Sequence, residues 1–228
     1  MSWLVTNKRS FFRQQAAMFG LMGLMVIIFG AQLRLPYEVQ AHFMAVPADV
    51  VESWNLLLEG KPSAGVLWSF ITLVTYSFMH ASLDHIASNL LFYWVFGALI
   101  NELLGWRWLL GMVLFTAVGG GVVHTLMNPE TWGPMVGASG VVSGFMGAFL
   151  GLAVRWQLPN PHIWPIARPI PPANLGYLAL VFIIIDYRAI FTGEASMTAF
   201  GAHVGGFTAG LFMACFITPR PAAAIQRR

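Results

Sequence analysis

Six apolar stretches of helix length follow one another along this chain, and few charged residues interrupt them. They cover residues 16–31, 83–100, 108–127, 136–154, 175–190 and 200–217. A helix needs about 20 apolar residues to cross a bilayer. The chain is 57% hydrophobic and 9% charged, whereas a soluble domain carries about 25% charged residues. The sequence therefore predicts an all-α membrane protein with six transmembrane helices, and the composition excludes an ordinary soluble domain.

The length of 228 residues accommodates six spans and their connections. We therefore expect a single membrane domain over residues 1–228, with an N-terminal flank at 1–15 and a C-terminal tail at 218–228. A long outer loop is expected at 33–80. The first stretch also resembles a secretory signal, but no small-x-small cleavage site follows it, so we interpret it as an uncleaved span. The lone cysteine, Cys215, excludes an intramolecular disulfide.

The positions of the lysines and arginines predict the orientation of the chain, because cytoplasmic flanks are enriched in these residues. With six spans and a cytoplasmic N-terminus, nine cations lie inside and three outside. The inner set is Lys8, Arg9, Arg13, Arg107, Arg155, Arg168, Arg220, Arg227 and Arg228, and the outer set is Arg34, Lys61 and Arg188. We expect a multi-pass protein of the cell membrane with both termini cytoplasmic. The short, scattered basic flanks do not indicate nucleic-acid binding.

One further apolar segment, at 64–79, makes the number of spans ambiguous. Counting it as a seventh span would place Arg107, Arg155 and the C-terminal arginines outside, against the charge rule. We therefore expect this segment to lie in the membrane interface as part of the outer loop.

Three polar residues lie close to the starts of alternate spans. His85, Ser139 and His203 are near the beginning of the second, fourth and sixth stretches. In the orientation above, these three spans run from outside to inside, so the three side chains share one shallow outer layer. Polar groups placed in hydrocarbon lose their water and persist mainly where they pair with each other or perform chemistry.

Glycines recur at helical spacing in the two spans that carry Ser139 and His203. The fourth span has Gly140, Gly144, Gly147 and Gly151, and the sixth has Gly206 and Gly210. Faces of small residues let membrane helices approach closely. If the two glycine faces meet, Ser139 and His203 come within hydrogen-bonding distance, and the imidazole can take the hydroxyl proton to activate a serine nucleophile.

Acyl transfer also needs donors for the oxygen that becomes negative in the tetrahedral intermediate. His85 and Asn89, at positions i and i+4, share one side of the second span and are candidates for oxyanion stabilisation. The N-terminus of the fourth span offers further donors, because its first N–H groups lack helical partners. Without a catalytic role, His85 and Asn89 would form a polar clasp between helices.

These residues resemble those of the rhomboid intramembrane serine proteases. The resemblance rests on Gly137-Ala-Ser-Gly140, on His203 within Ala-His-Val-Gly-Gly, and on His80-x4-His85-x3-Asn89, and it extends over residues 68–217. It implies a rhomboid-like bundle of six transmembrane helices that cleaves transmembrane protein substrates near their outer ends. It also implies a Ser139–His203 dyad with His85 and Asn89 supporting the oxyanion, and no cofactor or metal.

The sequence departs from many rhomboids at two places. A Trp-Arg pair of the outer loop is replaced by Ile71 and Thr72, which puts loop packing in question more than activity. A tyrosine found in some bacterial members is replaced by Ser143. The resemblance implies no acidic third member of the dyad, and we interpret Asp186 and Arg188 as an interfacial ion pair.

Other functions remain alternatives. His80, His85, His124 and His203 could be ligands of a metal-dependent membrane hydrolase or transporter, although no HExxH spacing is present. A catalytically silent rhomboid-like protein would bind membrane segments without cutting them. The sequence leaves open the physiological substrate, the cleavage-site preference, the route of substrate entry, the oligomeric state and the roles of His80 and His124.

Overall fold

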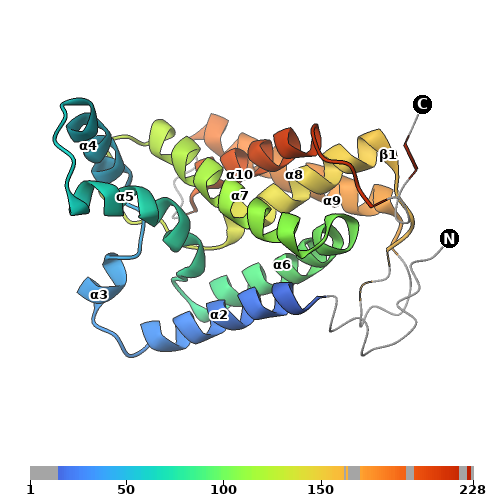
Figure 1. Cartoon of the computed structure of the whole chain (residues 1–228), viewed down its shortest axis with the longest axis horizontal. Coiled ribbons are helices and arrows are strands. Elements are labelled where there is room, and N and C mark those ends of the chain that lie inside the picture. The colour runs from blue at the N-terminus through green and yellow to red at the C-terminus, as the bar shows by residue number, and fades with distance from the viewer. Residues whose placement is uncertain (1–14, 162, 164–169, 194–197, 221–224, 227–228) are drawn as a thin grey trace.

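The chain folds as a bundle of helices with a smaller lobe at one end (Figure 1). The computed structural model describes residues 15–161, 163, 170–193, 198–220 and 225–226. Its elements are α2 (Ala16–Gln32), α3 (Tyr37–Ala41), α4 (Pro47–Leu58), α5 (Ala64–Thr75), the 3-10 helix η1 (Tyr76–Phe78), α6 (Leu83–Leu104), α7 (Trp106–Met127), α8 (Ser139–Arg155), β1 (Trp156–Gln157), α9 (Pro172–Thr192), α10 (Phe200–Ala214) and β2 (Ile225–Gln226).

Each of the six predicted apolar stretches forms a helix: α2, α6, α7, α8, α9 and α10. The starts differ from the predicted ones by at most three residues: α9 begins earlier, at Pro172 rather than at residue 175, and α8 begins later, at Ser139 rather than at residue 136. Gly137 has a φ of +117°, outside the range of an α-helix. The helix therefore begins only after this glycine, and Ser139 is its first residue.

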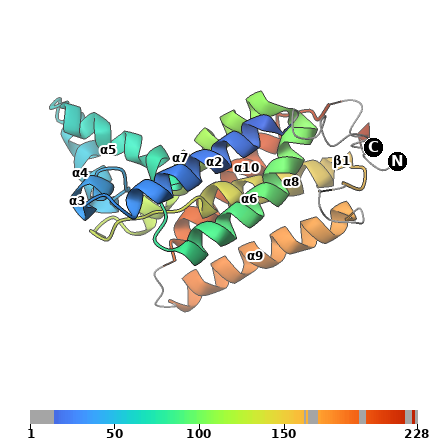
Figure 2. The same cartoon turned by 90° about the horizontal axis from the view of Figure 1, so that it is seen from below.

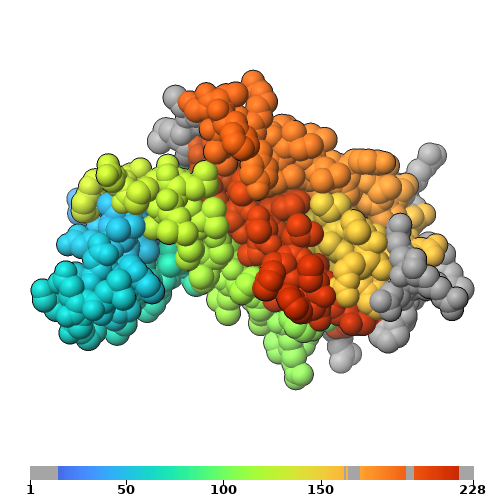
Figure 3. Space-filling view, turned by 90° about the horizontal axis from the view of Figure 1, so that it is seen from above, coloured from blue at the N-terminus to red at the C-terminus, as the bar shows by residue number. Residues whose placement is uncertain are grey.

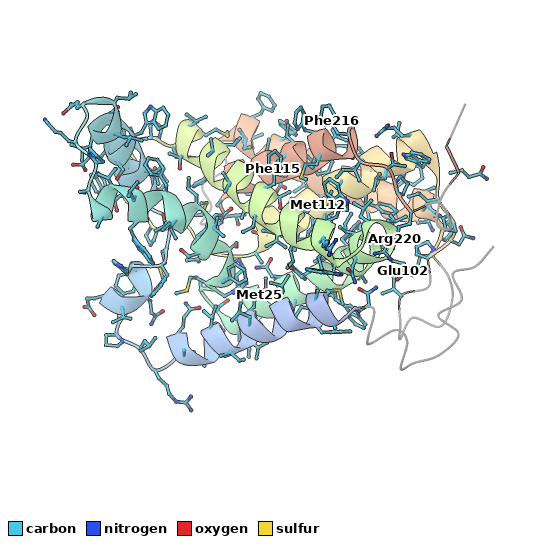
Figure 4. All side chains as sticks on the ribbon, viewed as in Figure 1. Met25, Glu102, Met112, Phe115, Phe216 and Arg220 are labelled. Atoms are coloured by element: carbon cyan, nitrogen blue, oxygen red, sulfur yellow. The ribbon has the colours of Figure 1, made fainter. Side chains whose placement is uncertain are left out.

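In the part of the chain that the structure describes, three helices are long and apolar enough to cross a membrane by length and composition: α6, α7 and α9. Helices α2, α8 and α10 are apolar but shorter, with 17, 17 and 15 residues. Phe115 on α7 and Phe216 just after α10 point outward, whereas Met25 and Met112 are buried (Figure 4). An apolar outer surface on an apolar helical bundle is that of a membrane protein. The number of spans remains a prediction.

Helices α6, α8 and α10 all begin at the end of the bundle that carries α3, α4 and α5, while α2, α7 and α9 end there (Figures 1 and 2). The apolar segment expected at 64–79 forms α5 and η1, which belong to this lobe. The Trp68 indole donates a hydrogen bond to the His42 carbonyl over 2.7 Å, and the two rings are stacked. Because α6, α8 and α10 all begin at the end that carries this lobe, their first residues lie at the same end of the bundle.

Helix α10 packs directly against α8 and α7, and Figure 3 shows it between α7 and α9. A Cβ added at Gly206 would overlap the Gly140 carbonyl, and one at Gly210 would overlap the Gly144 carbonyl. On the other side, a Cβ at Gly205 would collide with the Gly119 carbonyl on α7. The backbones of α8 and α10 thus touch through the glycine faces that the sequence predicted.

The opposite end of the bundle holds Arg155 and Arg220, two of the cations that the sequence predicts on the inner side. The Arg155 guanidinium donates to the carbonyls of Ala214 and Ile217 at the end of α10, which complements the helix dipole. Arg220 interacts with the charge of Glu102, as their positions in Figure 4 allow, and its backbone N–H donates to Leu103 over 2.9 Å. Strand β1 pairs antiparallel with β2 at this end. The predicted inner cations Lys8, Arg9, Arg13, Arg168, Arg227 and Arg228 lie outside the described residues.

Replacing Gly210 with alanine tests the contact between α8 and α10. The new methyl would overlap the Gly144 carbonyl, and overpacking typically costs about 1–3 kcal/mol. We expect Gly210→Ala to lower the thermal unfolding temperature in detergent micelles. Gly23→Ala on α2 is the matched control, because a Cβ there meets nothing within 4 Å. Equal unfolding temperatures for both variants would contradict the proposed packing.

Candidate functional site

Ser139 lies where an irregular connection enters α8. The Gly137 backbone N–H donates to the Tyr76 carbonyl over 3.0 Å, and the Tyr76 hydroxyl donates to the Ala117 carbonyl over 3.0 Å. Tyr76 is buried, so these bonds fix the connection to the interior of the protein. The left-handed backbone of Gly137 turns the chain directly into the helix. Ser139 is thereby held at the first position of α8.

The hydroxyl of Ser139 and the imidazole of His203 are in contact. Their Oγ and Nε2 atoms are 2.8 Å apart, although the residues are 64 positions apart in the chain. His203 is the fourth residue of α10. The glycine faces predicted that α8 and α10 approach closely, and the backbones of these two helices do meet immediately beyond this pair. A serine hydroxyl hydrogen-bonded to an imidazole is the arrangement that allows proton transfer to the ring and nucleophilic attack by oxygen.

The second nitrogen of His203 is also in contact. Its Nδ1 lies 3.0 Å from Oδ1 of Asp186, a residue of α9 that is 7% exposed. The sequence predicts an interfacial pair of Asp186 with Arg188 and no acidic group on the histidine. Residues i and i+2 of a helix do not face each other, so Asp186 turns toward α10 while Arg188 lies on a different face of α9.

His85 and Asn89 lie beside Gly137, next to Ser139. A Cβ at Gly137 would meet His85 Nε2 at 2.6 Å and Asn89 Nδ2 at 3.5 Å. The Ala81 N–H contacts His85 Nδ1 at 3.4 Å, so Nδ1 is the acceptor and the proton of the neutral ring is on Nε2. Two N–H groups from one face of α6 therefore lie beside Gly137, two residues before Ser139.

Asn89 is buried, yet its Nδ2 has no hydrogen-bond partner among the residues that the structure describes. A buried donor without a partner carries a desolvation penalty. The backbone N–H groups at the start of α8 also lack helical acceptors, and Ala138 provides no side-chain cap. Such donors match what a negatively charged oxygen requires.

His80 and His124 flank the site without contacting Ser139. The His80 and His85 rings meet edge to face, with their centroids 5.3 Å apart and their planes inclined at 71°, and the His80 backbone N–H donates to Gln32 on α2. His124 is near the start of α10, where Asn128 donates to its carbonyl over 3.0 Å. Among the described residues, no three His, Cys, Asp or Glu side chains gather as a group that could hold a metal ion.

Asp186 is the residue that sequence reasoning missed. It is the only acidic residue in α9, and an acidic side chain within an apolar helix normally faces the interior of a bundle and a partner. This rule predicts that the Asp186 side chain is buried and has a partner. The sequence does not show which of the neighbouring helices supplies the partner, because the connection from α9 to α10 has no fixed geometry.

Comparison with known proteins places these residues in a family. The family model described as "Rhomboid domain" matches residues 66–220, which include Ser139, His203, His85, Asn89 and Asp186. The chain therefore belongs to the rhomboid family. The expected resemblance is confirmed at this level.

Curated relatives support the same family at moderate sequence identity. The rhomboid protease GlpG of Yersinia pestis is 29% identical over 159 residues, which cover 67% of this chain and 50% of that protein. Rhomboid-like protein 11, chloroplastic, of Arabidopsis thaliana is 39% identical over 135 residues, covering 59% of this chain and 43% of that protein. The chain spans about half the length of the curated relatives it matches.

His80 makes the stability of the connection between η1 and α6 sensitive to acid. Burial, and to a smaller extent the charge of His85, lower the pKa of His80 from 6.5 to about 4. A lowered folded-state pKa means that protonation favours the unfolded state. The contribution of neutral His80 to the free energy of unfolding is complete above pH 6.5 and is lost as the pH falls toward 4. The loss is at most about 3 kcal/mol.

We expect His80→Phe to lose less thermal stability than the wild type between pH 7 and pH 4, as measured by unfolding in micelles, because phenylalanine keeps the ring and does not titrate. His42→Phe, at an exposed histidine of the same lobe, is the control and should follow the wild type. Parallel curves for His80→Phe and the wild type would refute this role of His80.

Proposed function

We propose that this rhomboid-family chain is an intramembrane serine endopeptidase that cleaves transmembrane segments of membrane proteins near the outer face. The observation that carries the proposal is the 2.8 Å contact between Ser139 Oγ and His203 Nε2. It occurs at the start of α8, beside the N–H groups of His85 and Asn89. The name "rhomboid protease" borne by the Yersinia relative agrees with this chemistry.

In the proposed reaction, His203 Nε2 accepts the Ser139 proton while Oγ attacks the carbonyl carbon of the substrate peptide. The carbonyl π electrons move to oxygen and form a tetrahedral oxyanion. Collapse of this intermediate breaks the C–N bond, and the protonated His203 gives its proton to the leaving amine. Water, activated by His203, then attacks the acyl-enzyme ester and releases the carboxylic acid with Ser139 restored.

The donors beside Ser139 stabilise the oxyanion in this proposal. Asn89 Nδ2 and His85 Nε2–H approach from α6, and backbone N–H groups approach from the start of α8. All of them are held by the fold before substrate arrives, so little reorganisation is needed during the reaction. The unpartnered state of Asn89 Nδ2 among the described residues fits a donor whose acceptor is the reacting oxygen.

The proposal includes the membrane arrangement predicted from the sequence: six spans, cytoplasmic termini, and an outer loop at 33–80 with an interfacial segment, in a single domain. Helix α8 extends about 26 Å and α10 about 22 Å at 1.5 Å per residue, less than the ~30 Å hydrocarbon core. Irregular backbone at membrane depth is tolerated where protein or water covers it. Ser139 would therefore lie just below the outer surface, where water is available for hydrolysis.

Substrates in this proposal are transmembrane helices with residues that weaken the helix near their outer ends. A spanning helix has its carbonyls hydrogen-bonded within the segment. It must therefore unwind locally before Ser139 can attack. No cofactor is required by the reaction as written.

Removal of the serine hydroxyl is the first test. We expect proteoliposomes containing the wild type to cleave a model transmembrane segment, and Ser139→Ala or His203→Ala to reduce cleavage to background, because each removes one side of the proton transfer. Ser143→Ala, the same substitution one turn further along α8, is the matched control and should retain activity. Cleavage products are followed by gel electrophoresis and mass spectrometry.

The alternatives give different outcomes in the same experiment. Activity that survives Ser139→Ala and is abolished by a chelator would favour a metal-dependent hydrolase. Retention of the segment in pull-down without any cleavage by the wild type would favour a silent binder. Either result would overturn the proposed function.

The oxyanion donors provide a second test. Loss of one such donor typically lowers kcat by about 10²–10³, and the interaction is made in the transition state. We therefore expect His85→Ala and Asn89→Ala each to lower kcat by this factor while KM stays close to the wild-type value. Ser88→Ala, at an exposed neighbour on α6, is the control. A change in KM alone would indicate a role in binding rather than in oxyanion stabilisation.

A further inference from the structure

We propose that Asp186 is a positioning residue for His203, so that the site works through an aspartate–histidine–serine arrangement rather than a dyad. The inference rests on the proposed protease function, because it assigns a role within that same site. It differs from the sequence expectation, in which no acidic group acts on the histidine.

Three helices supply the three groups. Asp186 is on α9, His203 on α10 and Ser139 on α8. The Asp186 Oδ1 to His203 Nδ1 distance is 3.0 Å, and the His203 Nε2 to Ser139 Oγ distance is 2.8 Å. The side chains of His203 and Asp186 are 16% and 10% exposed. The two ring nitrogens are therefore both engaged, one by a carboxyl group and the other by a hydroxyl.

The chemistry of the partners fixes the tautomer of the ring. A carboxylate only accepts hydrogen bonds, so Nδ1 must donate to Asp186. In the neutral imidazole the other nitrogen, Nε2, then has a lone pair. This is the nitrogen that faces Ser139, and a lone pair there is what proton abstraction requires. When His203 takes the serine proton, the carboxylate also stabilises the resulting imidazolium.

The location of Asp186 favours a specific role over a chance polar contact. It is the fifteenth residue of α9, an apolar helix long enough to cross a membrane, and the only acidic residue of that helix. Placing a carboxylate in such a segment is costly unless it is paired. A hydrogen bond that only tied α9 to α10 could be made by a neutral amide, whereas control of the His203 tautomer needs a group that cannot donate.

Asp186→Asn separates these two roles. Asparagine has the same shape and can keep a hydrogen bond to the ring, but its amide can donate to Nδ1 and place the ring proton on Nε2. In soluble serine proteases the corresponding change costs about 10⁴ in kcat. We expect Asp186→Asn to lower kcat by about 10²–10⁴ with KM nearly unchanged, and Asp186→Glu to recover part of the loss.

The control for removal of an acidic charge is Asp49→Asn, at an exposed aspartate of α4, which should behave as the wild type. Asp186→Asn with wild-type kcat, or Asp186→Glu no more active than Asp186→Asn, would overturn the inference.

A spectroscopic measurement tests the inference without relying on cleavage. Nitrogen-15 NMR of histidine-labelled wild type in micelles at alkaline pH should show His203 with its proton on Nδ1, and Asp186→Asn should move the proton to Nε2. The His203 signals are assigned by their loss in His203→Gln. A wild-type ring protonated on Nε2 would contradict the role of Asp186.

The two readouts distinguish the two proposals. If the wild type fails to cleave while NMR places the proton on Nδ1, the proposed function fails and the orienting contact remains. If wild-type cleavage depends on Ser139 but is indifferent to Asp186→Asn, the protease function remains and the role of Asp186 is refuted.

Discussion

The direct contact between the backbones of α8 and α10 is the constraint on which the site depends. Gly206 and Gly210 face carbonyl groups of α8 so closely that no side chain fits between them. Helices normally pack with their axes 8–10 Å apart, and larger side chains at this contact would separate Ser139 from His203. The 2.8 Å contact between hydroxyl and imidazole follows from this packing.

The same packing explains why polar chemistry is possible in so apolar a chain. Asp186, His203 and Ser139 lie on three different helices, and each finds its partner on another helix: Asp186 contacts His203, and His203 contacts Ser139. Asn89 differs, because its amide is buried and has no partner among the described residues. A lipid-exposed set of such groups would be costly. Inside the bundle, their pairing offsets the cost of removing them from water.

Much of the fold could be predicted from the sequence. The apolar stretches predicted the ends of six helices to within a few residues, because length and hydropathy decide where membrane helices form. These helices are α2, α6, α7, α8, α9 and α10. The glycine spacing predicted which helices would touch, and the positions of Ser139 and His203 predicted their contact. The late start of α8 was missed, since hydropathy does not reveal the left-handed backbone at Gly137. The Asp186 contact was also missed, because sequence adjacency suggested Arg188 while helix geometry turns the carboxyl group to α10.

The most direct test of Ser139 as the nucleophile is a structure of the protein after reaction with a fluorophosphonate. We expect a covalent bond between phosphorus and Ser139 Oγ, with the phosphoryl oxygen within hydrogen-bonding distance of Asn89 Nδ2 and His85 Nε2, and with His203 still hydrogen-bonded to Asp186. A phosphonate bound to another residue, or an oxygen directed away from α6, would contradict this expectation.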